Sequence, residues 1–174
     1  MHAIQQVQEL FGYLRKKYPE MTFIAIEPAY KMVHDYAYNK PTLVMATKGT
    51  IESEKFNLLL KKYDNHKTFI LPCVGLADII EEGNLENIKH YLTENIGKYK
   101  GKVENIVLGC THYPLIQNEI EEVLGNVTFF NGAPNLARHL REVLEEKNLL
   151  NDCGNGTIIF EDSQGLPEKE KRTT

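Results

Sequence analysis

The sequence lacks any long apolar stretch. Its longest uninterrupted apolar runs are about five residues, whereas a helix needs about 20 to cross a bilayer. The N-terminus has no apolar core of the kind that marks a secretory signal peptide. Together these two absences predict a cytoplasmic protein that does not enter a membrane.

The sequence also lacks an excess of positive charge. It has 20 lysine and arginine residues against 24 aspartate and glutamate residues, which gives a net charge of −4. The two signs are interspersed, so there is no basic stripe for a nucleic acid and no polybasic or lipidation signal for a membrane surface. We therefore expect neither nucleic acid nor membrane as a partner.

Cysteine is scarce and irregularly spaced. The three thiols are Cys73, Cys110 and Cys153. An odd number at scattered positions fits reduced thiols better than a disulfide framework. No CxxC pair or paired histidine spacing indicates a zinc site, so no bound metal is expected.

Apolar residues recur in a pattern of alternating strands and helices. The chain of 174 residues is long enough for one α/β domain or two small lobes. Strands are predicted at 22–26, 42–45, 68–71, 106–108, 127–130 and, last, 156–160. Helices are predicted at 3–18 and 29–38, then in sequence between the later strands, with Thr50 and Asn84 as N-caps.

This alternation predicts the fold class. Strands separated by helices of 10 to 15 residues require right-handed crossovers, and these give a parallel sheet with helices on both faces. The expected fold is therefore a doubly wound α/β sheet. In such a sheet the turns that follow the strands all lie at the carboxyl edge, where ligands bind.

One of these turns combines a thiol, a hydroxyl and an imidazole. In the stretch 104–116, the strand 106–108 ends at Gly109, and Pro114 is expected to open an amphipathic helix carrying Leu115, Ile116, Ile120, Val123 and Leu124. The turn between them holds Cys110, Thr111 and His112. A strand, a turn and a helix start therefore fall within a dozen residues.

The position of Cys110 suggests two interpretations. Free cysteine is among the most buried residue types, so packing against the strand is the simpler one. A following helix N-terminus and the nearby His112 would instead favour a thiolate or an anionic ligand. From residue types and spacing alone, both interpretations stay open.

Four sequence blocks resemble those of glutamate racemases, in the same order and at similar spacing. They are IEPA at 26–29, VMATKGTIES at 44–53, ADIIEEG at 77–83 and VLGCTHYPL at 107–115. The resemblance implies a cofactor-independent interconversion of L- and D-glutamate that supplies peptidoglycan synthesis. It also implies two similar α/β lobes, with a catalytic cysteine on each side of the small-molecule substrate.

The resemblance assigns roles to individual residues. Cys110 is similar to one of the two catalytic cysteines, and His112 to the histidine that assists it. Glu81 resembles a carboxylate near that cysteine, although the adjacent Glu82 leaves the alignment open by one position. These three residues are the predicted catalytic group.

The same resemblance implies substrate contacts from threonines. Thr111 matches a contact made through its backbone and hydroxyl, and Thr47 and Thr50 match a polar turn that faces the ligand. Cys73 and Cys153 match no catalytic position, so they are expected to be buried or incidental thiols.

Three family motifs are missing. No Asp-Ser-Gly strand motif, Pro-Tyr-Gly loop or Cys-Asn-Thr motif with the first catalytic cysteine occurs in the sequence. The chain therefore resembles a racemase without its first third. The expected domains are 1–28 as a remnant of the first lobe, 29–130 as the second lobe, 131–164 as a return segment and 165–174 as a disordered tail.

This departure shapes the functional expectation. Racemisation needs a base on one face of the α-carbon and an acid on the other, and one thiol supplies half of that pair. The chain alone is expected to be inactive. It is also expected to self-associate as a homo-oligomer or to be less stable than a complete relative. The reason is that the helix at 3–18 carries an apolar face that a complete lobe would cover, and that a sheet edge would be exposed.

Two other functions fit the same residues. One is a non-catalytic α/β domain or binding module that retains the half-site. The other is a Cys-His hydrolase with Cys110 as nucleophile and His112 as base. Residues two apart in a turn are poorly placed to reach each other, which makes the hydrolase the weakest of the three.

Overall fold

The computed structural model describes residues 3–24, 29–151 and 153–154, with side chains from residue 10 onward. The predicted strand at 156–160 and the predicted tail at 165–174 lie outside these residues. The chain divides into two compact units, Met1–Leu140 and Arg141–Thr174. All strands of the described residues belong to the first unit.

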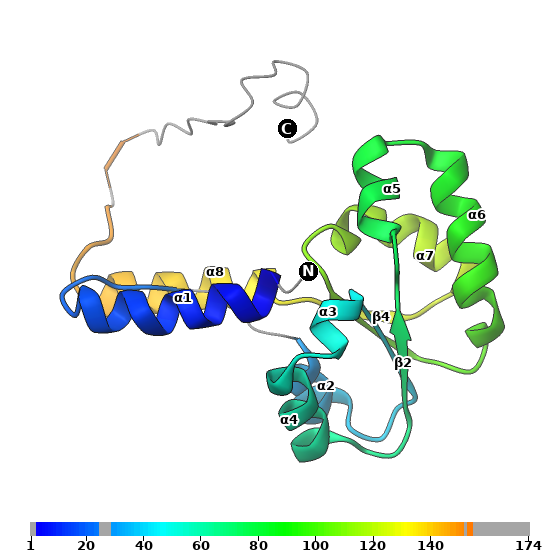
Figure 1. Cartoon of the computed structure of the whole chain (residues 1–174), viewed down its shortest axis with the longest axis horizontal. Coiled ribbons are helices and arrows are strands. Elements are labelled where there is room, and N and C mark those ends of the chain that lie inside the picture. The colour runs from blue at the N-terminus through cyan, green and yellow to red at the C-terminus, as the bar shows by residue number, and fades with distance from the viewer. Residues whose placement is uncertain (1–2, 25–28, 152, 155–174) are drawn as a thin grey trace. The chain divides into compact units, whose positions relative to one another are not determined.

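Within the described residues, four parallel strands form one sheet in the order β2-β1-β3-β4. Their bounds are β1 (Thr42–Ala46), β2 (Thr68–Pro72), β3 (Asn105–Gly109) and β4 (Thr128–Phe130). Strand β1 pairs with β2 on one side and β3 on the other, so that Ala46 lies level with both Pro72 and Gly109. Figure 1 shows β2 leading into α5 (Leu76–Glu82) at its carboxyl end.

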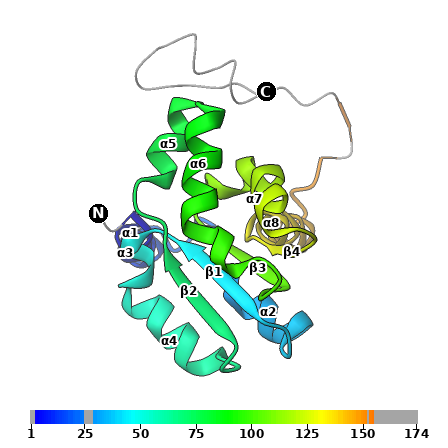
Figure 2. The same cartoon turned by 90° about the vertical axis from the view of Figure 1, so that its right-hand side faces the viewer.

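Helices cover both faces of this sheet, which confirms the doubly wound α/β fold. Alternate residues of β1 point to opposite faces, as a strand requires. Val44 and Ala46 pack with α2 (Tyr30–Ala37) and α4 (Glu54–Tyr63). Leu43 and Met45 pack with the other layer, formed by α5, α6 (Leu85–Ile96) and α7 (Gln117–Leu124) (Figure 2).

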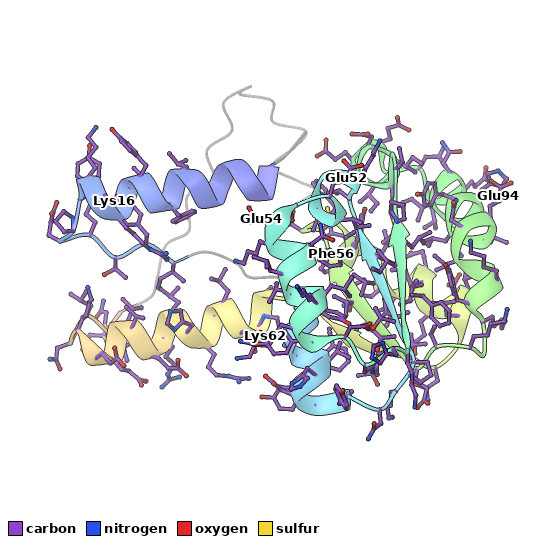
Figure 3. All side chains as sticks on the ribbon, turned by 60° about the horizontal axis from the view of Figure 1, so that its bottom comes forward. Lys16, Glu52, Glu54, Phe56, Lys62 and Glu94 are labelled. Atoms are coloured by element: carbon purple, nitrogen blue, oxygen red, sulfur yellow. The ribbon has the colours of Figure 1, made fainter. Side chains whose placement is uncertain are left out.

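The turn after β1 contains a short helix that the sequence pattern did not predict. Thr47 caps α3 (Lys48–Ile51), and Ser53 caps α4 by accepting a hydrogen bond from the Phe56 backbone. The prediction that Thr50 caps the long helix is therefore wrong, because Thr50 lies inside α3. Figure 3 shows Phe56 on the sheet side of α4, where it is 3% exposed.

The connection from α5 to α6 is built as predicted. Gly83 ends α5 with a positive φ of 71°, which a residue without a side chain adopts without strain. Asn84 then caps α6 by accepting hydrogen bonds from the next turn of backbone. A 3₁₀ turn, η1 (Gly97–Tyr99), follows α6.

The first helix, α1 (Ala3–Lys17), confirms the predicted helix at 3–18. The strand predicted at 22–26 does not form in its described part, 22–24, and its remainder lies outside the described residues. This segment folds back on α1 instead. Arg15 donates a hydrogen bond to the Phe23 carbonyl over 3.0 Å, and the Phe23 ring packs edge-on against Phe11.

The helix predicted to open at Pro114 begins differently. A 3₁₀ turn, η2 (Tyr113–Ile116), comes first, and α7 starts only at Gln117. Leu115 is 72% exposed and does not join the buried face of the helix. Helix α8 (Ala133–Glu146) follows β4 as predicted. No helix among the described residues is both long and apolar enough to cross a membrane.

We predict that the sheet centre dominates stability. Leu43 is fully buried in β1, so Leu43→Ala should lower the free energy of unfolding by about 2 to 5 kcal/mol through lost burial and a cavity. Leu58→Ala is the matched control, because Leu58 is 60% exposed on α4 and should change stability little. Urea denaturation measures both. Equal losses in the two variants would contradict this assignment of the core.

Candidate active site

The candidate site lies where the sheet changes winding direction. From β1 the chain moves to β2 on one side and then crosses to β3 on the other side. Ligands bind at the carboxyl ends of strands at such a switch point. The turn after β1 begins at Thr47 and the turn after β3 begins at Cys110, so these two predicted turns leave adjacent strands at the same edge.

A close backbone approach brings these turns together. A Cβ atom added at Gly109 would lie 2.8 Å from the Cβ of Ala46 and 3.0 Å from the carbonyl oxygen of Met45. Neither neighbour is the end of a flexible side chain, so any larger residue at 109 would force the strands apart. The glycine at the end of β3 is therefore required by packing.

The thiol and the imidazole of the second turn are in contact. The Sγ atom of Cys110 lies 3.6 Å from Nδ1 of His112. The turn is closed by the Tyr113 N–H, which donates to the Cys110 carbonyl over 3.3 Å. The expectation that residues two apart in this turn are poorly placed to reach each other is therefore wrong, because the turn folds both side chains to the same side.

A carboxylate from another element completes the group. The Oε1 atom of Glu81, in the last turn of α5, lies 2.9 Å from Nε2 of His112. A carboxylate only accepts hydrogen bonds, so Nε2 donates its proton here and, in the neutral ring, Nδ1 is left as the acceptor facing Cys110. This contact decides between Glu81 and Glu82. The His112 side chain is 32% exposed and that of Glu81 is 63% exposed.

The surroundings of Cys110 differ from expectation in one respect. The turn is followed by the four-residue η2, and α7 begins seven residues after the thiol. An α-helix N-terminus therefore does not lie next to Cys110. The predicted stabilisation of a Cys110 thiolate by a helix dipole does not apply. The neighbouring polar group is the His112 ring, which itself is held by Glu81.

The threonines of the first turn bond to one another. The hydroxyl oxygens of Thr47 and Thr50 lie 2.9 Å apart, and the Thr50 N–H donates to Thr47 Oγ1 over 3.2 Å. Thr50 is 6% exposed, so its hydroxyl serves the turn. Thr111 is exposed beside Cys110. Their contact with a substrate stays a prediction.

A buried layer beneath the site was missed by sequence reasoning. Tyr113 is fully buried and its hydroxyl donates to the Cys73 carbonyl over 3.4 Å, joining the loop after β2 to the turn after β3. Burial raises the pKa of the Cys73 thiol to about 12 and also raises the pKa of Tyr113. The one feature of the sequence that could have indicated this layer is Tyr113, the aromatic residue that directly follows His112. Cys73 is 2% exposed, as expected for a buried thiol.

The described side chains offer no alternative metal centre. Among them, no group of three or more histidine, cysteine, aspartate or glutamate residues is arranged to hold an ion. The thiol, imidazole and carboxylate of this edge can accept, hold and return a proton, or attack an electrophilic carbon.

Comparison with proteins of known family assigns this chain to a family. No family model matches it. A glutamate racemase of Clostridium perfringens is 40% identical over 141 residues, which cover 78% of this chain and 54% of that protein. The chain is homologous to the glutamate racemases. It spans about half the length of the curated relatives that it matches.

Solved structures agree with this homology. A Francisella tularensis glutamate racemase, determined in complex with D-glutamate, is 29% identical with a TM-score of 0.59, over 73% of this chain and 48% of that one. A Thermus thermophilus glutamate racemase has a TM-score of 0.67 over 92% of this chain and 62% of that one. Its identity is 21%, so it supports the fold alone.

The two thiols of this sheet edge should differ sharply in reactivity. Because Cys73 is buried and its pKa is raised to about 12, iodoacetamide should not label it in the folded chain from pH 7 to 11. Cys110 is partly exposed and Cys153 exposed, so both should react. Peptide mass spectrometry gives each rate, and unfolding in urea should make Cys73 reactive. Labelling of folded Cys73 at the rate of Cys110 would contradict the burial argument.

The approach of the two strands can be tested at its narrowest point. Gly109→Ala should lower the free energy of unfolding by about 1 to 3 kcal/mol, because the added methyl overpacks against Ala46. Gly97→Ala is the matched control, since nothing lies within 4 Å of the added atom and its φ of −53° suits any residue. Thermal melts compare the two. A Gly109→Ala protein as stable as the control would show that the strands can separate freely.

Proposed function

We propose that this chain carries one half of a glutamate racemase site, in which Cys110 acts as the base for one enantiomer and the acid for the other. The observation that carries the proposal is the contact chain from Cys110 through His112 to Glu81, with distances of 3.6 and 2.9 Å. Homology to glutamate racemases supports glutamate as the small-molecule substrate. No cofactor is needed for this chemistry.

The proton path follows from the geometry. With Nε2 of His112 donating to Glu81, Nδ1 accepts the Cys110 proton and leaves a thiolate. The thiolate then removes the α-proton of a bound glutamate, while Glu81 stabilises the imidazolium. Such a positioned base contributes about 10²- to 10⁴-fold to proton abstraction. Glu81 is thus proposed to orient the His112 ring and to offset the positive charge that the ring gains.

Reprotonation on the opposite face requires a second group. Cys73, the other thiol of this edge, is 2% exposed and cannot meet the substrate. We propose that the opposing thiol comes from sequence outside these 174 residues, because the 141 residues matched to the Clostridium relative cover only 54% of that protein. The presence of one accessible thiol at this sheet edge also supports the alternative, a non-catalytic domain that retains a half-site.

The remaining roles complete the proposal. Thr111 is exposed beside the thiol, and Thr47 begins the adjacent turn with Thr50 behind it, so these residues can hold the substrate carboxylate and ammonium groups. The product D-glutamate would serve peptidoglycan synthesis in the cytoplasm. Self-association into a homo-oligomer is part of the same proposal.

Joining the missing half of the site should create activity. We predict that the chain alone does not racemise glutamate, whereas a fusion to the part of the Clostridium relative that this chain does not match does so in both directions. In that fusion Cys110→Ala should abolish racemisation, because either direction needs both thiols. Cys153→Ser is the matched control and should retain activity. Circular dichroism starting separately from L- and D-glutamate measures the rates.

Two results would contradict this assignment. One is racemisation by the 174-residue chain alone, since it would show that no second thiol is required. The other is a folded Cys110→Ala fusion that keeps most of its activity. A fusion that folds and binds glutamate without racemising it would favour the non-catalytic alternative.

A further inference from the structure

A second activity is open to the same three side chains, and it needs no opposing thiol. We propose that this chain is a thiol esterase that hydrolyses small activated esters, with Cys110 as the nucleophile. The proposal does not depend on glutamate racemisation, because an acyl carbon is attacked from one side only. It is carried by the geometry of Cys110, His112 and Glu81 together with the backbone beside them.

The three residues have the spatial order of a nucleophile, a base and a group that orients the base. Nδ1 of His112 faces the thiol at 3.6 Å, and Nε2 of the same ring faces the Glu81 carboxylate at 2.9 Å. Hydrolases on unrelated folds share this order, and roles and distances identify it better than position in the sequence. Here the carboxylate lies 31 residues from the imidazole.

The backbone after Cys110 offers donors for a developing negative charge. Over the residues that the structure describes, the N–H groups of Thr111 and His112 have no hydrogen-bond partner within the chain. The N–H of the residue after a nucleophile is a common part of an oxyanion hole. Removing one such donor typically costs about 10²- to 10³-fold in rate, so two free donors here are significant.

The edge is accessible and partly apolar. Cys110 is partly exposed, and the Glu81 side chain is 63% exposed. Two apolar side chains on the loops of this edge project into solvent, Val74 after β2 with 64% exposure and Leu115 in η2 with 72%. Because these apolar side chains lie on loops of the same sheet edge as the thiol, a small ester with an aryl or alkyl group is the appropriate probe.

The reaction balances without any further reactant except water. His112 takes the thiol proton, the Cys110 sulfur attacks the carbonyl carbon, and a carbon–sulfur bond forms as the ester carbon–oxygen bond breaks. The leaving alcohol takes the proton from the His112 imidazolium. Water, deprotonated by His112, then cleaves the thioester and releases a carboxylic acid and the free thiol.

The test uses the full chain with Cys153→Ser, which removes the other exposed thiol, and p-nitrophenyl acetate as the probe. We expect a burst of one nitrophenolate per chain followed by steady turnover, with acetyl-Cys110 found by mass spectrometry after an acid quench. His112→Ala should slow acylation by about 10²-fold or more. Glu81→Gln should slow it by about tenfold, and the adjacent Glu82→Gln should leave it unchanged.

Two outcomes would overturn the proposal. If His112→Ala and Glu81→Gln both acylate at the parent rate, Cys110 is only an accessible thiol. If acetyl-Cys110 accumulates once and is never hydrolysed, the chain is not an esterase. Thermal melts verify that the variants fold, and the exposed Glu81→Gln provides the decisive comparison should His112→Ala unfold. Failure to racemise glutamate in any fusion leaves these results unaffected.

Discussion

The close contact between the ends of β1 and β3 is the constraint on which the rest of the site depends. Because Gly109 has no side chain, the two strands lie so close together that a Cβ atom at this position would clash with Ala46. Because these strands carry the two polar turns, their separation fixes how far Thr47 lies from Cys110. The chain changes winding direction at this pair of strands, and ligands of open α/β sheets bind at the carboxyl ends of strands at such a point. The packing of the two strand ends therefore depends on Gly109.

Burial gives the two thiols of this edge opposite properties. Cys73 lies under the loops, where lost hydration raises its pKa to about 12 and keeps it protonated. Cys110 is one layer further out and meets an imidazole. Tyr113 connects the two layers, since its ring fills the core and its hydroxyl reaches the Cys73 carbonyl. The turn that holds Cys110 thus lies on a buried layer formed by Tyr113 and Cys73.

The proposed racemase and esterase reactions share one thiol and differ in the atom presented to it. A thiolate that meets an α-carbon hydrogen acts as a base, and the same thiolate that meets an acyl carbon acts as a nucleophile. His112 and Glu81 serve both reactions, because each requires the thiol proton to move onto an oriented ring. Only racemisation requires a second group on the far side of the substrate.

The sequence by itself determined the elements whose signals are local. Short apolar runs bounded by turn residues located β1, β2, β3 and β4. Asn84 marked the start of α6, because a cap bonds to backbone within three residues. The thiol and imidazole of the site were likewise visible as neighbours. Only the tertiary structure decided that the segment expected as a strand at 22–26 packs back on α1 in its described part. It also decided that Ser53 and not Thr50 caps α4, and that Glu81 and not Glu82 reaches His112. These outcomes depend on groups from separate elements, whose distances are set by packing of the whole sheet and leave no trace in local sequence.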